Sequence, residues 1–120
     1  MKKLMVVSVA VVVAGLVVVG GAWAADADSA VTVKGEVLDM ACYLDHGAHG
    51  EKHAGCAAKC IESGLPVGIK SEDGKTYLLI GEHKPLNSEL AQYAGKTITV
   101  KGKLVSRDGI NMIENAEIQK

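Results

Sequence analysis

Apolar and polar residues alternate along several short stretches of this 120-residue chain, and such alternation is the pattern of a strand with one buried face. The clearest case is residues 96–105, where Ile98, Val100 and Leu104 are interleaved with threonines and lysines. Similar patterns recur on both sides of it. They predict five strands, at residues 31–39, 66–70, 75–80, 96–105 and 110–119.

Glycines and Asp-Gly steps indicate how these strands connect and bend. The Asp-Gly steps at residues 73–74 and 108–109 each separate two predicted strands, and Asp-Gly is a strong hairpin-turn signal. Gly35 and Gly102 lie inside strands, where glycine permits the sharp coiling that closing a small sheet demands. Uneven apolar spacing in the last strand predicts a bulge near Glu114.

Two stretches have helical character instead. The alanine content and spacing of residues 53–63 predict a short helix, with Gly64 placed as a left-handed C-terminal cap. A second short helix is expected at residues 87–93, with Asn87 or Ser88 as its N-cap.

Five short strands with a helix between the third and the fourth have the element order of an OB-fold barrel. We therefore expect a mainly β protein, a five-stranded OB-fold-like barrel. Residues 42–64 form an insertion between strands one and two, made of a glycine-rich loop at residues 44–50 and the first helix. This connection lies at the mouth of an OB barrel, where the fold commonly binds ligands.

Two motifs resemble a group of known proteins. Residues 33–37 spell Val-x-Gly-x-Val, and residues 94–102 spell Ala-Gly-Lys-x-Ile-x-Val-x-Gly. Both are similar to the opening and the fourth strand of small exported bacterial OB-fold proteins, including largely uncharacterised members with a Cys/His-rich insertion. The resemblance covers nearly all of the chain from Val31 onward, and it implies the fold much more than the function.

The first 24 residues have the features of a signal peptide. Two lysines precede an apolar run that ends before a glycine pair, and Ala-x-Ala at residues 22–24 offers the small residues that a signal peptidase requires. Residues 25–30 are then a flexible N-terminus of the mature protein, and residues 31–120 are its single domain. Such a protein is periplasmic or secreted, and it contacts a membrane only through an uncleaved signal segment.

Composition argues against several classes of function. Without the predicted signal the chain keeps all 14 acidic residues and loses two of its 13 basic ones, so it is net acidic. It has no phenylalanine and only three tyrosines, too few stacking rings and too little positive charge for a nucleic-acid partner. No nucleophile, base and orienting acid can be assembled from its motifs, so we expect a binding protein and not an enzyme.

All three cysteines and three of the four histidines fall within one short segment, at steps of four, three, four, three and four. They are Cys42, His46, His49, His53, Cys56 and Cys60. These steps keep side chains on one stripe of an α-helix, but a continuous helix would spread that stripe over about 27 Å, too far for one ion. Three intervening glycines also oppose such a helix. The donors converge only if the loop folds Cys42 back over the helix that carries Cys56 and Cys60.

Thiols and imidazoles are soft donors, which suit Cu(I) or Zn(II) and do not suit Mg(II) or Ca(II). We expect this chain to bind such an ion, copper before zinc. The predicted ligands are Cys42, His53, Cys56 and Cys60, with His49 or His46 as an alternate nitrogen donor. The Cys-x3-Cys pair at residues 56–60 resembles that of exported copper chaperones, as an analogy of ligand type alone.

A disulfide is the main alternative, because exported proteins meet an oxidising compartment. Cys42 paired with Cys56 or Cys60 would staple the insertion to the barrel and leave one thiol over. Such a module would bind a small molecule or a protein partner in the periplasm. Thiol redox chemistry is a third, weaker hypothesis. A metal and a disulfide alike require Cys42 to lie close to Cys56 or Cys60.

Four further residues could support such a site, but we expect each to have an ordinary structural role. Asp39 and Asp45 flank the cluster in positions to orient a ligating imidazole, but isolated carboxylates are more often solvated, and solvation is what we expect here. Met40 and Met112 offer thioethers to a copper site, but both are expected in the core.

Overall fold

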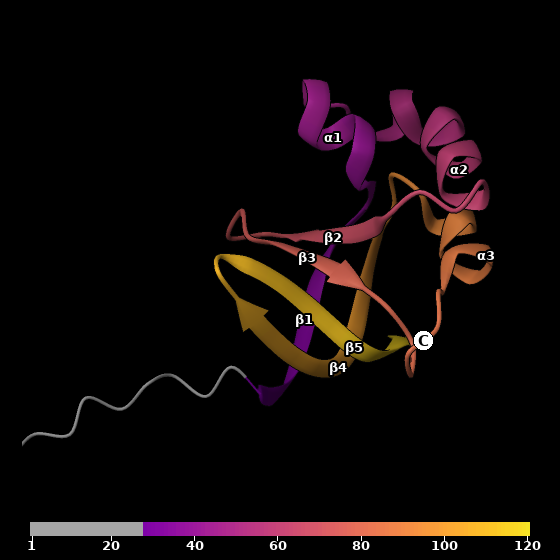
Figure 1. The fold of residues 1–120 in the computed structure, drawn as a ribbon. Coiled ribbons are helices and arrows are strands. Elements are labelled where there is room, and N and C mark those ends of the chain that lie inside the picture. The colour runs from indigo at the N-terminus through magenta and orange to yellow at the C-terminus, as the bar shows by residue number, and fades with distance from the viewer. Residues whose placement is uncertain (1–27) are drawn as a thin grey trace, which may run out of the picture.

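The computed structural model describes residues 28–120, which form a barrel with helices gathered at one end (Figure 1). The strands are β1 (Asp28–Asp39), β2 (Val67–Ser71), β3 (Thr76–Leu79), β4 (Thr97–Arg107) and β5 (Ile110–Gln119). The helical elements are α1 (Met40–His46), η1 (Glu51–His53), α2 (Ala54–Glu62), α3 (Asn87–Leu90) and η2 (Ala91–Tyr93). No helix in this described part is long and apolar enough to cross a membrane. The predicted signal segment lies outside the described residues.

The barrel closes in the order β1-β2-β3-β5-β4. Neighbouring strands are antiparallel except for the parallel pair of β3 and β5. This order confirms the expected five-stranded OB-fold-like barrel, with a helical insertion between β1 and β2 and a short helix between β3 and β4.

The first strand pairs with two neighbours, β4 along its first part and β2 along its last. The two ladders overlap at Gly35 and Glu36, and Gly35 lies opposite Ile98 of β4 and Ser71 of β2. A Cβ atom at Gly35 would lie 2.1 Å from the carbonyl oxygen of Lys70, so only glycine allows β2 to approach this closely. The glycine therefore permits the coiling that carries β1 from one neighbour to the other.

The last strand contains the predicted bulge. Lys101 of β4 lies opposite Glu117, whereas Lys103 lies opposite Glu114, so β5 has one residue more than β4 over this interval. Within this bulge, Asn115 adopts a left-handed conformation with φ 50°.

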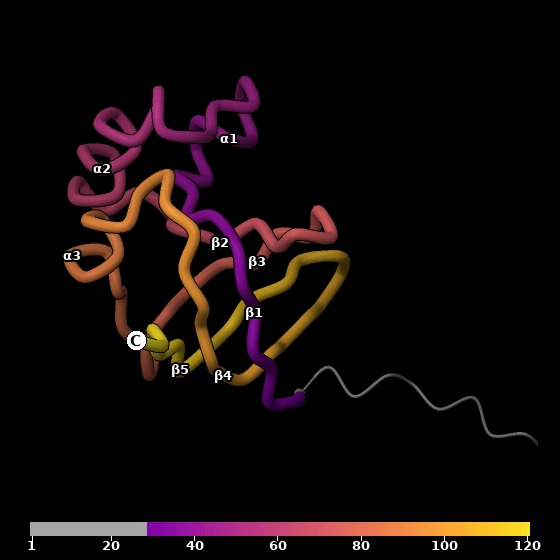
Figure 2. Tube along the Cα trace, turned by 180° about the vertical axis from the view of Figure 1, so that it is seen from behind, coloured from indigo at the N-terminus to yellow at the C-terminus, as the bar shows by residue number. Residues whose placement is uncertain are grey.

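The core is aliphatic and extends from the barrel into α2. Ile69, Val100 and Ile113 of the strands are fully buried, and Ala57 and Ile61 of α2 belong to the same cluster. In both views α1 and α2 lie at the same end of the barrel, with α3 next to α2 (Figures 1 and 2). The insertion thus closes one end of the barrel through the buried face of α2.

Helix α1 takes up the first three residues of the glycine-rich loop expected at residues 44–50. Asp39 caps its first turn, where its side chain accepts the N–H of Ala41 at 3.0 Å. Gly47 ends it in a left-handed conformation, φ 71°. Both cap residues are typical of helix ends, but a seven-residue helix carries too little apolar periodicity to be recognised from its pattern.

The start of α3 also differs from the prediction. Its N-cap residue is Leu86, and no side chain caps it. The Asn87 amide instead donates to the carbonyl oxygens of Ile61, at 2.8 Å, and Leu65, at 2.7 Å. The Asn87 side chain, which the local pattern assigned to a cap, therefore makes tertiary hydrogen bonds to the end of α2 and the residues after it.

Candidate metal centre

Asp39 is buried at the junction of β1 and α1, contrary to the expectation of a solvated carboxylate. Only 1% of its surface is exposed, and it is the only buried charged residue in the described part of the chain. Its Oδ1 accepts the N–H of Ala41, while Oδ2 has no hydrogen-bond partner among the described residues. Capping of α1 therefore accounts for Oδ1 alone.

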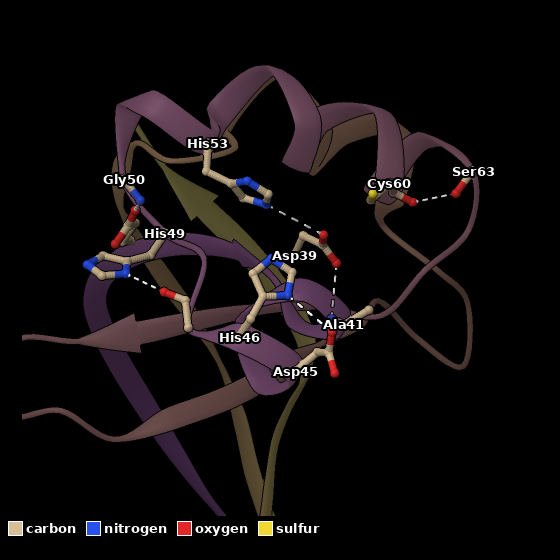
Figure 3. Close-up of polar contacts among 11 residues, drawn as sticks. Asp39, Ala41, Asp45, His46, His49, Gly50, His53, Cys60 and Ser63 are labelled. Carbon is tan, nitrogen blue, oxygen red and sulfur yellow. Dashed lines mark hydrogen bonds and ion pairs between the residues drawn. The ribbon is translucent and has the colours of Figure 1, made fainter.

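His53 faces this second oxygen from the start of α2. Its Nε2 lies 3.9 Å from Asp39 Oδ2, too far for a hydrogen bond, and it is also buried without a hydrogen-bond partner (Figure 3). Two buried polar atoms therefore face each other at the distance of an ion pair, with no hydrogen bond to either.

Cys42 and Cys60 lie beside the same carboxylate. One ligand atom each from Asp39, Cys42 and Cys60 all lie within 4.8 Å of one another. Cys42 comes from the first turn of α1 and Cys60 from the last turn of α2, so the folded loop brings them together across 18 positions of sequence. The expected approach of Cys42 to Cys60 is thus confirmed.

The environment holds both thiols in their neutral form. Hydrogen bonding of the Cys42 thiol to the Asp39 carboxylate, followed by burial, raises the pKa of Cys42 to about 12. Burial and the charge of Asp39 also raise the pKa of Cys60. Reactive redox thiols have a lowered pKa, so neither cysteine has the environment of an oxidoreductase nucleophile.

The other three predicted donors lie further out. Cys56 is exposed on α2 and does not belong to the group around Asp39. His46, at the end of α1, is exposed, but its ring centroid lies 6.5 Å from that of His53. His49 is exposed in the following loop, where its Nδ1 lies 2.8 Å from the carbonyl oxygen of Gly47 and its ring packs edge-on against Tyr43.

Close backbone packing fixes the insertion that carries these donors. Met40 is buried at the base of α1, and a Cβ atom at Gly68 of β2 would lie 2.5 Å from its sulfur. Gly95 approaches the start of α2 in the same way, since its Cβ would lie 2.9 Å from the carbonyl oxygen of Gly50. The N–H of Gly50 in turn donates to the side chain of Glu36 in β1. The donors are therefore held by elements packed on the barrel.

Met112 is only half-buried, in β5.

Asp39 is the residue of this group that sequence reasoning did not assign as a donor. A carboxylate beside histidines and cysteines is seldom buried, so solvation was the reasonable expectation. The available signal was its place directly before α1, because an N-cap residue turns its side chain toward the first turn of its helix, where Cys42 lies.

Comparisons of the chain with protein-family models, with curated proteins and with solved structures find no match.

Proposed function

We propose that this protein binds one transition-metal ion through Asp39, Cys42, His53 and Cys60. Two observations carry the proposal: Asp39 forms a close group with the thiols of Cys42 and Cys60, and Asp39 Oδ2 and His53 Nε2 are buried without a hydrogen bond. His53 is not part of that close group and approaches it through Asp39, so its imidazole must move toward the thiols to complete the site. A buried polar atom without a hydrogen bond is costly, and a bound cation removes that cost for both. Donor atoms around one zinc ion lie roughly 3.3 to 3.8 Å apart, so the 3.9 Å between these two needs only a small adjustment.

The donor set favours zinc over copper. Two sulfurs, one imidazole nitrogen and one carboxylate oxygen match the tetrahedral preference of Zn(II). Cu(I) prefers sulfur donors, and the carboxylate would add little to its binding. The buried Asp39 therefore reverses the order expected from cysteines and histidines alone, while Mg(II) and Ca(II) are disfavoured by the thiols.

Binding through these thiols must release protons. Cys42 and Cys60 are neutral in the metal-free chain because both have a raised pKa, and only thiolates bind zinc well. Uptake of one ion therefore releases about two protons, so the affinity falls steeply as the pH is lowered.

The setting of this activity is part of the same proposal. An N-terminal signal segment would place the protein in the periplasm or outside the cell, where a small carrier with no catalytic constellation receives an ion and gives it up. Its net acidic composition suits a metal cargo and does not suit nucleic acid. Its protein partner would be a donor or acceptor of the ion.

A disulfide between Cys42 and Cys60 is the second candidate. Their sulfur atoms lie within 4.8 Å of each other, so a modest movement of α1 toward α2 would join them. The bond would close a loop of about 18 residues and add roughly 3 kcal/mol of stability, with Cys56 left as a free thiol. In that form the protein is a stapled interaction module, and Asp39 Oδ2 and His53 Nε2 stay buried without a hydrogen bond.

Metal analysis combined with thiol counting separates the two candidates. Protein purified without chelator, from its native compartment or refolded with Zn²⁺, should carry one ion per chain and three alkylatable thiols after metal removal. Asp39→Asn, His53→Gln and Cys60→Ser should each weaken binding at least about tenfold, whereas His83→Gln in a remote loop should not. A folded chain that takes up neither Zn²⁺ nor Cu⁺, or that holds a Cys42–Cys60 disulfide throughout, would overturn the metal proposal.

A further inference from the structure

Two further soft donors border the proposed site on its solvent side. His46 has 58% of its side chain exposed, yet its ring lies at right angles to the inner His53 with centroids 6.5 Å apart. In Figure 3 the His46 ring lies between Asp45 and the imidazole of His53. A small rotation of either ring therefore brings a second imidazole to an ion held by His53.

The hydrogen bond of His46 prepares it as a ligand. Its Nδ1 lies 3.1 Å from the Asp45 carboxylate, and in the neutral tautomer that donates through Nδ1 the Nε2 is free to bind an ion. Carboxylate–imidazole pairs of this kind are the usual support of metal-binding histidines. His49 has no such neighbour toward the site, since its ring packs against Tyr43.

Cys56 stands in the same relation to the other inner donors. It lies three residues after His53 and four before Cys60, so it neighbours both on the surface of α2. It is exposed to solvent. Each outer donor thus adjoins an inner donor of its own kind, imidazole beside imidazole and thiol beside thiol.

Resting on the metal-binding function proposed above, we propose that His46 and Cys56 are exchange ligands. They pass the ion between the inner four donors and a carrier in solution that presents thiolate or imidazole groups. A closed four-coordinate site releases its ion slowly, and a site that also has outer donors can replace its bonds one at a time. An ion without geometric preference, such as Zn(II), tolerates the intermediate arrangements.

The exchange steps balance without any oxidant. In one step His46 forms a bond to the ion and the bond from His53 breaks, with no proton moved. In the other, the Cys56 thiol loses its proton to solvent as its sulfur binds the ion, and the Cys60 thiolate takes up a proton as its bond breaks. The ion then keeps its bonds to Asp39 and Cys42 beside the two outer ligands. Thiolates of the carrier replace these four ligands one at a time, and the Cys42 and Cys56 thiolates take up protons from solvent as their bonds break.

The test separates affinity from rate, with Zn²⁺ as the ion. His46→Gln and Cys56→Ser are loaded with one equivalent of Zn²⁺, and its transfer to a chromophoric thiol chelator is followed by stopped flow. Both variants should still hold one ion at equilibrium but transfer it about tenfold more slowly than the unmodified chain. His49→Gln, an exposed histidine of the same insertion, is the matched control and should transfer at the unmodified rate.

Three results would count against the proposal in distinguishable ways. Variants that transfer the ion as fast as the unmodified chain would overturn the exchange role and leave the inner site standing. Variants that lose the ion at equilibrium would show that His46 or Cys56 is an inner ligand, which also overturns the exchange role. An unmodified chain that binds no Zn²⁺ would overturn the proposed function and the exchange role together.

Discussion

The carboxylate of Asp39 lies between the two helices of the insertion. It accepts the N–H of Ala41 and interacts with the thiol of Cys42 in α1, and its Oδ2 lies 3.9 Å from His53 Nε2 at the start of α2. At the scale of single residues it sets the chemistry of the site. It keeps the Cys42 thiol neutral when no ion is bound, and it provides an oxygen donor when one is. Its effects are therefore measurable with and without metal.

Asp39→Asn should make Cys42 react faster with alkylating agents. The carboxylate is the main cause that raises the pKa of Cys42 to about 12, and its removal lets the pKa fall toward the ordinary cysteine value of 9.0. More thiolate is then present at neutral pH, so the alkylation rate of Cys42 should rise by at least about tenfold in the metal-free chain. Mass spectrometry of the peptide that contains Cys42 measures this rate, with exposed Cys56 as the internal reference. Equal Cys42 rates in the two chains would contradict it.

The same pKa shift predicts how stability depends on pH. The folded chain holds the Cys42 proton more tightly than the unfolded chain, because the pKa of Cys42 is about 12 in the fold and that of an ordinary cysteine is 9.0. This contribution to the free energy of unfolding is fully present below pH 9 and is lost as the pH rises toward 12. Urea unfolding of the reduced, metal-free chain at about pH 8 and about pH 10 measures the loss. The free energy of unfolding of Asp39→Asn should fall less between these two pH values. An equal fall in the two chains would exclude the raised pKa of Cys42 as its cause.

At the scale of elements, the site depends on how α1 and α2 are seated on the barrel. The barrel and α2 follow from the sequence because alternation, Asp-Gly turns and an alanine-rich stretch are local signals. Helix α1 does not, since its seven residues are specified mainly by caps and by contact with β2. Convergence of Cys42 with Cys60 was required by chemistry, but the burial of Asp39 depends on tertiary packing that no local pattern contains.

Gly68→Ala should disturb the packing of α1 against β2. The added Cβ would lie 2.5 Å from the sulfur of Met40 and 2.7 Å from the carbonyl oxygen of Tyr77. We expect a loss of roughly 1 to 3 kcal/mol in unfolding free energy, together with weaker zinc binding as α1 moves. Denaturant unfolding and zinc titration measure the two effects.

The matched control for this change is Gly55→Ala. Gly55 is in α2, and a Cβ there meets nothing within 4 Å. An alanine should raise helix stability by about 0.5 to 1 kcal/mol and leave zinc binding intact. If Gly68→Ala bound zinc as well as Gly55→Ala, the position of α1 would not matter to the site.

At the scale of the whole molecule, the proposed ion joins the end of β1 to both helices of the insertion. Zn²⁺ binding should therefore raise the free energy of unfolding by about 2.7 kcal/mol when free zinc is a hundredfold above its Kd. The unfolding temperature of the chain should rise accordingly. Thermal unfolding with Zn²⁺ and with excess chelator measures the shift. His53→Gln should lose most of it, whereas His83→Gln should keep it. A shift of the same size in both variants would place the ion elsewhere.

The most direct test of the account is zinc X-ray absorption spectroscopy on the chain loaded with one equivalent of Zn²⁺. We predict a four-coordinate ion with two sulfur atoms at about 2.3 Å and two nitrogen or oxygen atoms near 2.0 Å. Asp39→Asn should lose one light-atom neighbour, and Cys60→Ser one sulfur. A shell without sulfur, or one with three sulfurs, would contradict the proposed set of Asp39, Cys42, His53 and Cys60.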